Sequence, residues 1–174
     1  MSNLFSSLNP DAVSKIRLHV EDNSQVVDKI VLDIIEPYIS DLDTYVSFVS
    51  DCLKDGNNPP SDAELEDFCL NLSAKIYWAS GGQELLGIRA DISEAVRKET
   101  FNNARDEHKG TVQDKNSKAE LASQQEQLVS ICYQRAHKTM KAKVESAQEL
   151  LGSCKKVLTH RMEELQLTRQ SIGT

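Results

Sequence analysis

The chain has 174 residues and a mass of 19.4 kDa, which is enough for one domain or for one domain with an appendage. Only 39% of its residues are hydrophobic and 5% are aromatic, whereas 27% are charged. These values favour stacked helices with narrow apolar faces over a thick core, so we do not expect a catalytic cleft enclosed by this chain alone.

The net charge of −7 hides a division between two parts of the chain. Residues 1–108 carry 9 Lys and Arg against 20 Asp and Glu, whereas residues 109–174 carry 11 against 7. Such an asymmetry is typical of a nucleic-acid surface or of an acidic docking surface. Acidic helices that lie against basic ones within the same fold would explain it equally well.

The four cysteines, Cys52, Cys69, Cys132 and Cys154, fall within or beside apolar stripes and show no metal-ligand spacing. The start of the chain has no signal-peptide pattern, so we expect reduced, buried thiols in a cytoplasm. The most apolar run, residues 26–39, is interrupted by charges and a proline. No membrane span is therefore predicted, and we expect a soluble protein.

An Asn-Pro pair at the start of the chain predicts a short helix from Pro10 to about Val20. Residues 21–24 (EDNS) are expected to break that helix and to cap the next one. Apolar residues then keep helical spacing over 25–55, and Pro37 is expected to kink or divide this second helix. Its outer face is strongly acidic.

Residues 54–60 (KDGNNPP) form the clearest loop in the sequence. The S-x-x-E spacing of a capping box follows and opens a helix over 61–78. Ser80–Gln83 contains two glycines and predicts a kink or a tight turn between helices. The helical pattern resumes over 83–109.

The stretch from Thr111 to about Gln170 contains no proline and only one glycine, Gly152. Its apolar residues recur mostly every three, four or seven positions, beginning with Leu121, Leu128 and Ile131, which predicts one long amphipathic helix. Gly110 is placed to end the preceding helix in the left-handed conformation, and Thr111 to cap this one. The side chains expected to mediate oligomerisation are Met140, Val144, Ala147, Leu151, Cys154, Leu158, Met162 and Leu165.

The predicted fold is therefore all-α, a helical hairpin with a long, coiled-coil-like C-terminal helix. Residues 1–58 form an acidic N-terminal helical region, residues 61–170 form the hairpin and oligomerisation domain, and residues 171–174 form a flexible tail. The apolar stripe is too long for the remaining helices of one chain to cover evenly, so a homo-oligomer is expected.

Basic residues cluster on the side of the long helix that faces away from its apolar stripe. A face of this kind can follow a phosphate backbone, although an ordinary solvated face has more weight from the pattern alone. Aromatic stacking platforms for bases would have to come from Tyr77, Trp78 or Tyr133, for each of which core packing is the expected role. The candidate nucleic-acid-binding residues are Arg135, Lys138, Lys141, Lys155 and Lys156.

Nothing in the sequence indicates catalysis. The four histidines do not pair with one another or with a cysteine at metal-binding spacing, and the glycines of Ser80–Gln83 lack the strand and the Lys-Ser/Thr pair of a phosphate loop. We therefore expect a protein that is not an enzyme and that has no cofactor and no metal site.

Several short segments between residues 65 and 170 carry a resemblance to a known family. They are Ala74–Trp78, Asn103–Arg105, Gly110–Lys115, Ala119–Glu120, Tyr133–Ala136 and Arg161–Leu165. In their order and spacing they resemble phage recombination mediators of the UvsY type.

The resemblance implies a small all-helical protein that forms rings or similar oligomers through its long C-terminal helix. It also implies binding to single-stranded DNA and loading of a RecA-like recombinase onto strands covered by single-strand-binding protein, in the cytoplasm of an infected bacterium. Two other classes stay open. One is an acidic helical adaptor or inhibitor of a host protein, and the other is a helical virion component.

Overall fold

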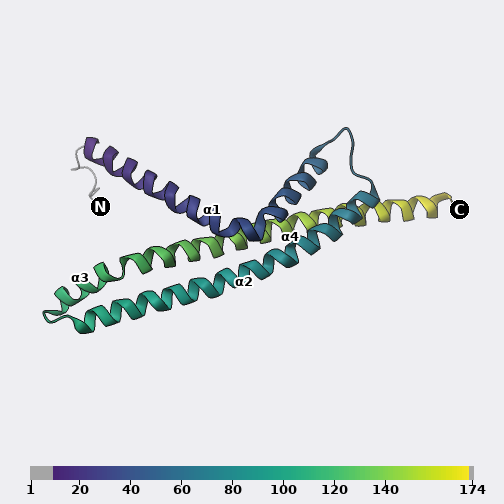
Figure 1. The fold of residues 1–174 in the computed structure, drawn as a ribbon. Helices are drawn as coiled ribbons and strands as arrows, with labels where there is room; N and C mark the ends of the chain where they lie inside the picture. Colours follow the sequence, from purple (N-terminus) through teal and green to yellow (C-terminus); the bar gives the residue numbers. More distant parts are fainter. Residues whose placement is uncertain (1–9, 173–174) are drawn as a thin grey trace, which may run out of the picture.

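The computed structural model describes residues 10–172, and it describes side chains for Glu21 and residues 24–167. Within residues 10–172 the chain is all-α and has no strand. Its four helices are α1 (Pro10–Lys54), α2 (Asp62–Glu107), α3 (Val112–Ala122) and α4 (Gln124–Ile172). The long helices α2 and α4 run side by side in opposite directions, and α1 lies across them (Figure 1).

The first helix is continuous, so the predicted break at residues 21–24 is wrong. Asp, Asn and Ser each cost a helix only a few tenths of a kcal/mol, which a long helix tolerates. Ser24 donates a hydrogen bond to Asp28 one turn on (3.4 Å) instead of capping a new helix.

α1 bends sharply in its middle, in the part that contains Pro37, as predicted (Figure 1). The predicted cap at Asn9 lies outside the described residues.

The predicted loop and the predicted N-caps at Ser61 and Thr111 are confirmed. α1 ends at Lys54 and α2 begins at Asp62, where the Ser61 hydroxyl accepts a hydrogen bond from the Glu64 backbone N–H (3.3 Å). The Glu64 carboxylate accepts one in return from the Ser61 N–H (2.7 Å). Thr111 and Asp114 form the same reciprocal pair at the start of α3.

The predicted turn at Ser80–Gln83 is wrong, because α2 continues straight through it. Gly82 is buried, and a Cβ atom placed on it would lie 2.7 Å from the Cβ of Tyr38 in α1. The glycine therefore permits a close approach of two helices and does not end one. This role depends on the contact with α1, which the residues around Gly82 do not indicate.

Gly110 also differs from its prediction. α2 ends at Glu107, and the capping residue His108 is extended, with φ of −87° and ψ of 131°. Gly110 lies beyond that point in the connection to α3, and its φ of 157° is a positive value that residues with a side chain rarely adopt. The helix thus ends before the glycine is reached.

The predicted single helix over Thr111–Gln170 is two helices, because Ser123 separates α3 from α4. Ser123 has a φ of −98° and a ψ of 9°, yet its N–H still bonds to the Ala119 carbonyl (3.0 Å). The interruption is therefore local, and α3 and α4 stay roughly in line (Figure 1). α4 extends to Ile172, so the first two residues of the predicted 171–174 tail are helical.

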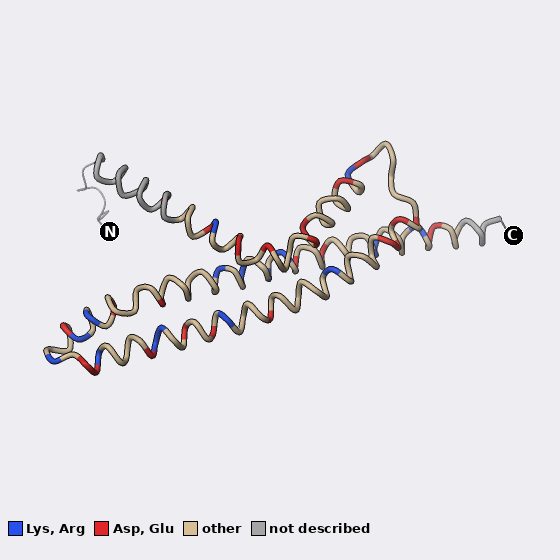
Figure 2. Tube along the Cα trace, in the orientation of Figure 1, with Lys and Arg blue, Asp and Glu red and all other residues tan. Residues whose placement is uncertain are grey.

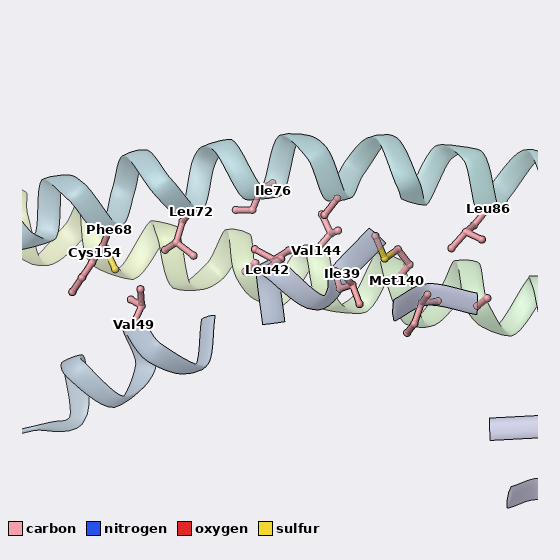
Figure 3. Close-up of a cluster of buried hydrophobic side chains, with 14 of the residues drawn as sticks. Ile39, Leu42, Val49, Phe68, Leu72, Ile76, Leu86, Met140, Val144 and Cys154 are labelled. Atoms are coloured by element: carbon pink, nitrogen blue, oxygen red, sulfur yellow. The ribbon is translucent and has the colours of Figure 1, made fainter. Parts of the chain in front are cut away.

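The core lies where the bend of α1 meets the α2–α4 pair. Figure 3 shows Ile39 and Leu42 of α1 beside Met140 and Val144 of α4. The core takes side chains from both predicted regions, 1–58 and 61–170, whose division into domains stays a prediction. Its members that are almost fully buried include Ile35, Val49, Leu65, Leu72, Leu86, Met140 and Cys154.

The connecting end of the hairpin, beyond the reach of α1, has a different interior. Small or polar side chains are buried between its helices: Ala90, Ser93, Ala119, Ser123 and Ser130. The large apolar residues Leu121, Leu128 and Ile131, predicted to lie on the buried stripe, are exposed. The predicted stripe is therefore wrong in this segment.

A carboxylate joins the two helices at this end. Glu94 of α2 accepts two hydrogen bonds from the Arg97 guanidinium (2.8 and 2.7 Å) and one from the Ser130 hydroxyl of α4 (3.1 Å). The Arg97 guanidinium, helped by Ser130 and by Lys98, lowers the pKa of Glu94 to about 2, against a desolvation cost that acts in the opposite direction.

Replacing Gly82 by Ala should destabilise the protein. The new methyl group would overlap Tyr38, and overpacking of this kind costs about 1–3 kcal/mol. Gly152→Ala in α4 is the matched control, because nothing lies within 4 Å of its added Cβ and alanine favours a helix by up to about 1 kcal/mol. In urea denaturation the free energy of unfolding should be highest for Gly152→Ala, intermediate for the wild type and lowest for Gly82→Ala. Equal stability of the two variants would contradict the close contact.

Acid should weaken the link through Glu94. Because the folded-state pKa is below the ordinary value of 4.5, the stabilisation is present above pH 4.5 and is lost as the pH falls toward about 2. We expect a contribution of about 1 kcal/mol, the upper end for an ion pair in contact with water. The free energy of unfolding of Glu94→Gln should therefore fall less between these pH values than that of the wild type or of Glu99→Gln.

Candidate nucleic-acid interface

The five basic residues predicted to bind nucleic acid are all exposed and lie on α4. Lys138 and Lys156 face away from the buried side of that helix, which holds Ala136, Met140 and Val144, and the other three lie on its flanks. The core fixes this orientation, because burying those three side chains determines which side of α4 is left in water. Arg135, Lys138, Lys141, Lys155 and Lys156 are together called the basic strip of α4.

The basic strip of α4 consists of two groups. Arg135, Lys138 and Lys141 follow one another at successive turns, and Lys155 and Lys156 lie roughly 20 Å farther along at a rise of about 1.5 Å per residue. Between the groups the exposed side chains of Glu145 and Glu149 interrupt the positive charge. Figure 2 shows this alternation of basic and acidic positions along the chain.

Two members of the strip have acidic partners. Arg135 lies 3.4 Å from the Asp28 carboxylate of α1, and Lys141 lies 3.8 Å from Glu145. Lys138, Lys155 and Lys156 take part in none of the ion pairs among the described side chains. These three lysines therefore have the charge that is most available to an anionic ligand.

Two further basic residues lie beside the apolar face of α4, where they connect α4 to other elements. Lys143 bonds to Asp43 of α1. Arg161 donates hydrogen bonds to the Pro60 carbonyl (2.7 Å) and to the Asp62 carboxylate (3.1 Å) at the start of α2. Both are partly buried, so we assign them to the fold and not to the interface.

The aromatic residues differ from their prediction. Tyr77 and Trp78 were expected in the core, but 73% and 76% of their surfaces are exposed. Their rings contact each other edge to face, with centroids 5.6 Å apart. Both lie on the side of α2 that is turned away from α4, so the structure does not bring them to the basic strip of α4. Tyr133 is half-buried against the core, as expected.

The predicted oligomerisation residues are mostly inside the chain. Met140, Val144, Ala147 and Cys154 are buried between α4, α2 and α1, and Leu151 and Leu158 pack partly against the same core. Other helices of the chain therefore cover Met140, Val144, Ala147 and Cys154, and the prediction that these four contact further copies is corrected, while for the partly buried Leu151 and Leu158 it stays a prediction. Met162 and Leu165, near the C-terminal end of α4, are exposed.

No cluster of reactive groups accompanies the basic strip. Among the described residues no three His, Cys, Asp or Glu side chains are grouped to hold a metal ion. All four cysteines are free, and burial raises the pKa of the Cys69 and Cys154 thiols, which lowers their reactivity. A hollow of about 730 Å³ lies between α1 and α2 and is lined by Tyr38, Asp41, Lys75 and Trp78 among others.

In the part of the chain that the structure describes, no helix is both long and apolar enough to cross a membrane. Comparison with protein-family models, curated proteins and solved structures gives no match.

Proposed function

We propose that the protein is a non-catalytic single-stranded-DNA-binding protein that uses the basic strip of α4. The supporting observation is the exposure of five cationic side chains on one face of a helix whose other face is held in the core. Three of them, Lys138, Lys155 and Lys156, lack an acidic partner among the described side chains, so a phosphate would not have to displace one.

Lysine and arginine bind phosphates largely by releasing the counterions condensed on the nucleic acid. The affinity gained in this way does not depend on the base sequence and decreases as salt increases. For a single strand that contacts all five residues, the logarithm of the association constant should fall by about 3 to 4 per tenfold increase in salt. Because the acidic Glu145 and Glu149 lie between the two groups, a single strand would bind more strongly to either group than to the helix surface between them.

The role of this binding in recombination rests on the resemblance to the UvsY-type mediators and not on the geometry. In that role, several copies present their basic strips to one strand and help a RecA-like recombinase to replace single-strand-binding protein. Self-association is part of the proposal. It must use surfaces other than the buried face of α4.

An interaction protein that binds no nucleic acid is the second candidate. The specific observation in its favour is that α1 presents exposed carboxylates at Asp33, Glu36, Asp41 and Asp51. Such a surface would suit a basic protein partner.

Binding to a fluorescently labelled oligothymidine tests the first proposal. The double variant Lys138→Glu/Lys156→Glu should weaken binding by about tenfold or more at low salt. The control Lys109→Glu/Lys118→Glu changes two exposed lysines at the connecting end of the hairpin and alters the net charge equally. It should weaken binding much less.

The absence of binding at low salt by a folded wild-type protein would overturn the proposal and favour the interaction protein. An equal loss in both double variants would overturn the assignment to α4. Trp78, the single tryptophan, provides a further readout because it lies on α2. Strong quenching of its fluorescence by the oligonucleotide would place the strand on the aromatic pair instead.

A further inference from the structure

The second helix, α2, is apolar on two sides. One side, with Leu72, Leu86 and Ala90, is buried against the rest of the chain. The other side is turned away from the core and carries apolar residues at alternating separations of three and four. We call these residues the outer stripe of α2: Trp78, which also borders the hollow between α1 and α2, and Gly81, Leu85, Ile88, Ile92 and Ala95.

The outer stripe of α2 is exposed throughout. Its spacing is that of the a and d positions of a heptad repeat, which forms a narrow stripe along one side of a helix and is typical of the contact between paired helices. A surface helix of a monomer usually has polar residues on this side. Large exposed apolar surfaces of this kind mark interaction sites.

The interior behind the C-terminal half of the outer stripe is filled by small side chains. Next to Ile88 and Ile92 the buried residues are Ala90, Ser93, Ser130, Cys132 and Ala136, whereas Leu86 and Met140 are buried behind Leu85. The single chain thus buries little apolar surface at this end. Covering the outer stripe of α2 would supply the burial that the interior does not.

We propose that a second copy of this chain covers the outer stripe, with the two α2 helices parallel and in register. The charges on either side of the stripe indicate that the partner is a second copy. Glu84 lies at a g position and Arg89 at the next e position, and both are exposed. Neither takes part in an ion pair among the described side chains.

In a parallel pair, a residue at g faces the residue five positions later, at e, on the other helix. Glu84 of each copy would therefore face Arg89 of the other, giving two equivalent pairs around a twofold axis. An antiparallel pair would instead place g beside g, and Glu84 would approach Asp91, another acid. The charges thus favour a parallel arrangement of identical helices.

The small residues of the outer stripe fit this arrangement, because Gly81 and Ala95 allow the two helices to approach closely at both ends. The stripe is about 27 Å long at a rise of about 1.5 Å per residue. The basic strip of α4 lies on the far side of each copy, so both strips would stay accessible. The dimer does not depend on nucleic-acid binding and can be tested without it.

Sedimentation equilibrium of the full-length chain, from low to high micromolar concentration, provides the test. The wild type should approach twice 19.4 kDa as concentration rises. Ile88→Asp would place two carboxylates in the contact and should weaken association by about a hundredfold or more. The matched control is Leu128→Asp on α4, because Leu128 is 49% exposed and Ile88 is 56% exposed. It should associate like the wild type, and both variants should keep the wild-type helical circular dichroism.

Charge exchange tests the orientation. Glu84→Arg alone and Arg89→Glu alone should each weaken the dimer, and the double exchange should restore it. A wild type that stays monomeric would overturn the proposal, as would loss of association in Leu128→Asp or its persistence in Ile88→Asp. Stronger association of Glu84→Arg would show relief of an acid-acid contact and would overturn the parallel arrangement.

Discussion

The contact between the bend of α1 and the paired helices α2 and α4 determines most of what this structure can do. Gly82 has no side chain, which lets Tyr38 approach α2 closely, and the same bend places Ile35, Ile39 and Leu42 in the core. The apolar face of α4 is covered as a result. A face that could have recruited other copies becomes the interior of one chain, and the opposite face of α4 becomes its exposed one.

The same crossing also accounts for part of the charge asymmetry. Two explanations were open from the sequence, an anion-binding surface and acidic helices packed on basic ones. The second holds for Arg135 with Asp28 and for Lys143 with Asp43, where α1 and α4 meet. It does not account for Lys138, Lys155 and Lys156, which have no such partner among the described side chains. These three lysines are therefore the part of the proposed DNA surface that forms no ion pair with the described part of the fold.

Features set by nearby residues could be predicted from the sequence. The capping box at Ser61, the N-cap at Thr111, the loop before Asp62 and the bend around Pro37 follow from hydrogen bonds or sterics within a few positions. The role of Gly82 could not be predicted, because it depends on Tyr38, more than forty positions away.

The exposure of Tyr77 and Trp78 was missed for a related reason. α2 has two apolar sides, and spacing alone does not tell which of them the rest of the chain will cover. The outward-facing lysines of α4 were found because the large residues Met140 and Val144 define its buried side clearly.

Thiol labelling of the native protein, followed by mass spectrometry, most directly tests whether one chain covers the apolar face of α4. The measurement should be made at a dilution where sedimentation shows only monomers. Cys154 is fully buried in this core, whereas Cys52 and Cys69 are partly exposed. The account predicts that Cys52 and Cys69 are modified first and that Cys154 reacts only at the rate at which the protein opens. Modification of Cys154 in the dilute monomer as fast as Cys52 would show that its face of α4 is not covered by the same chain, and would contradict the account.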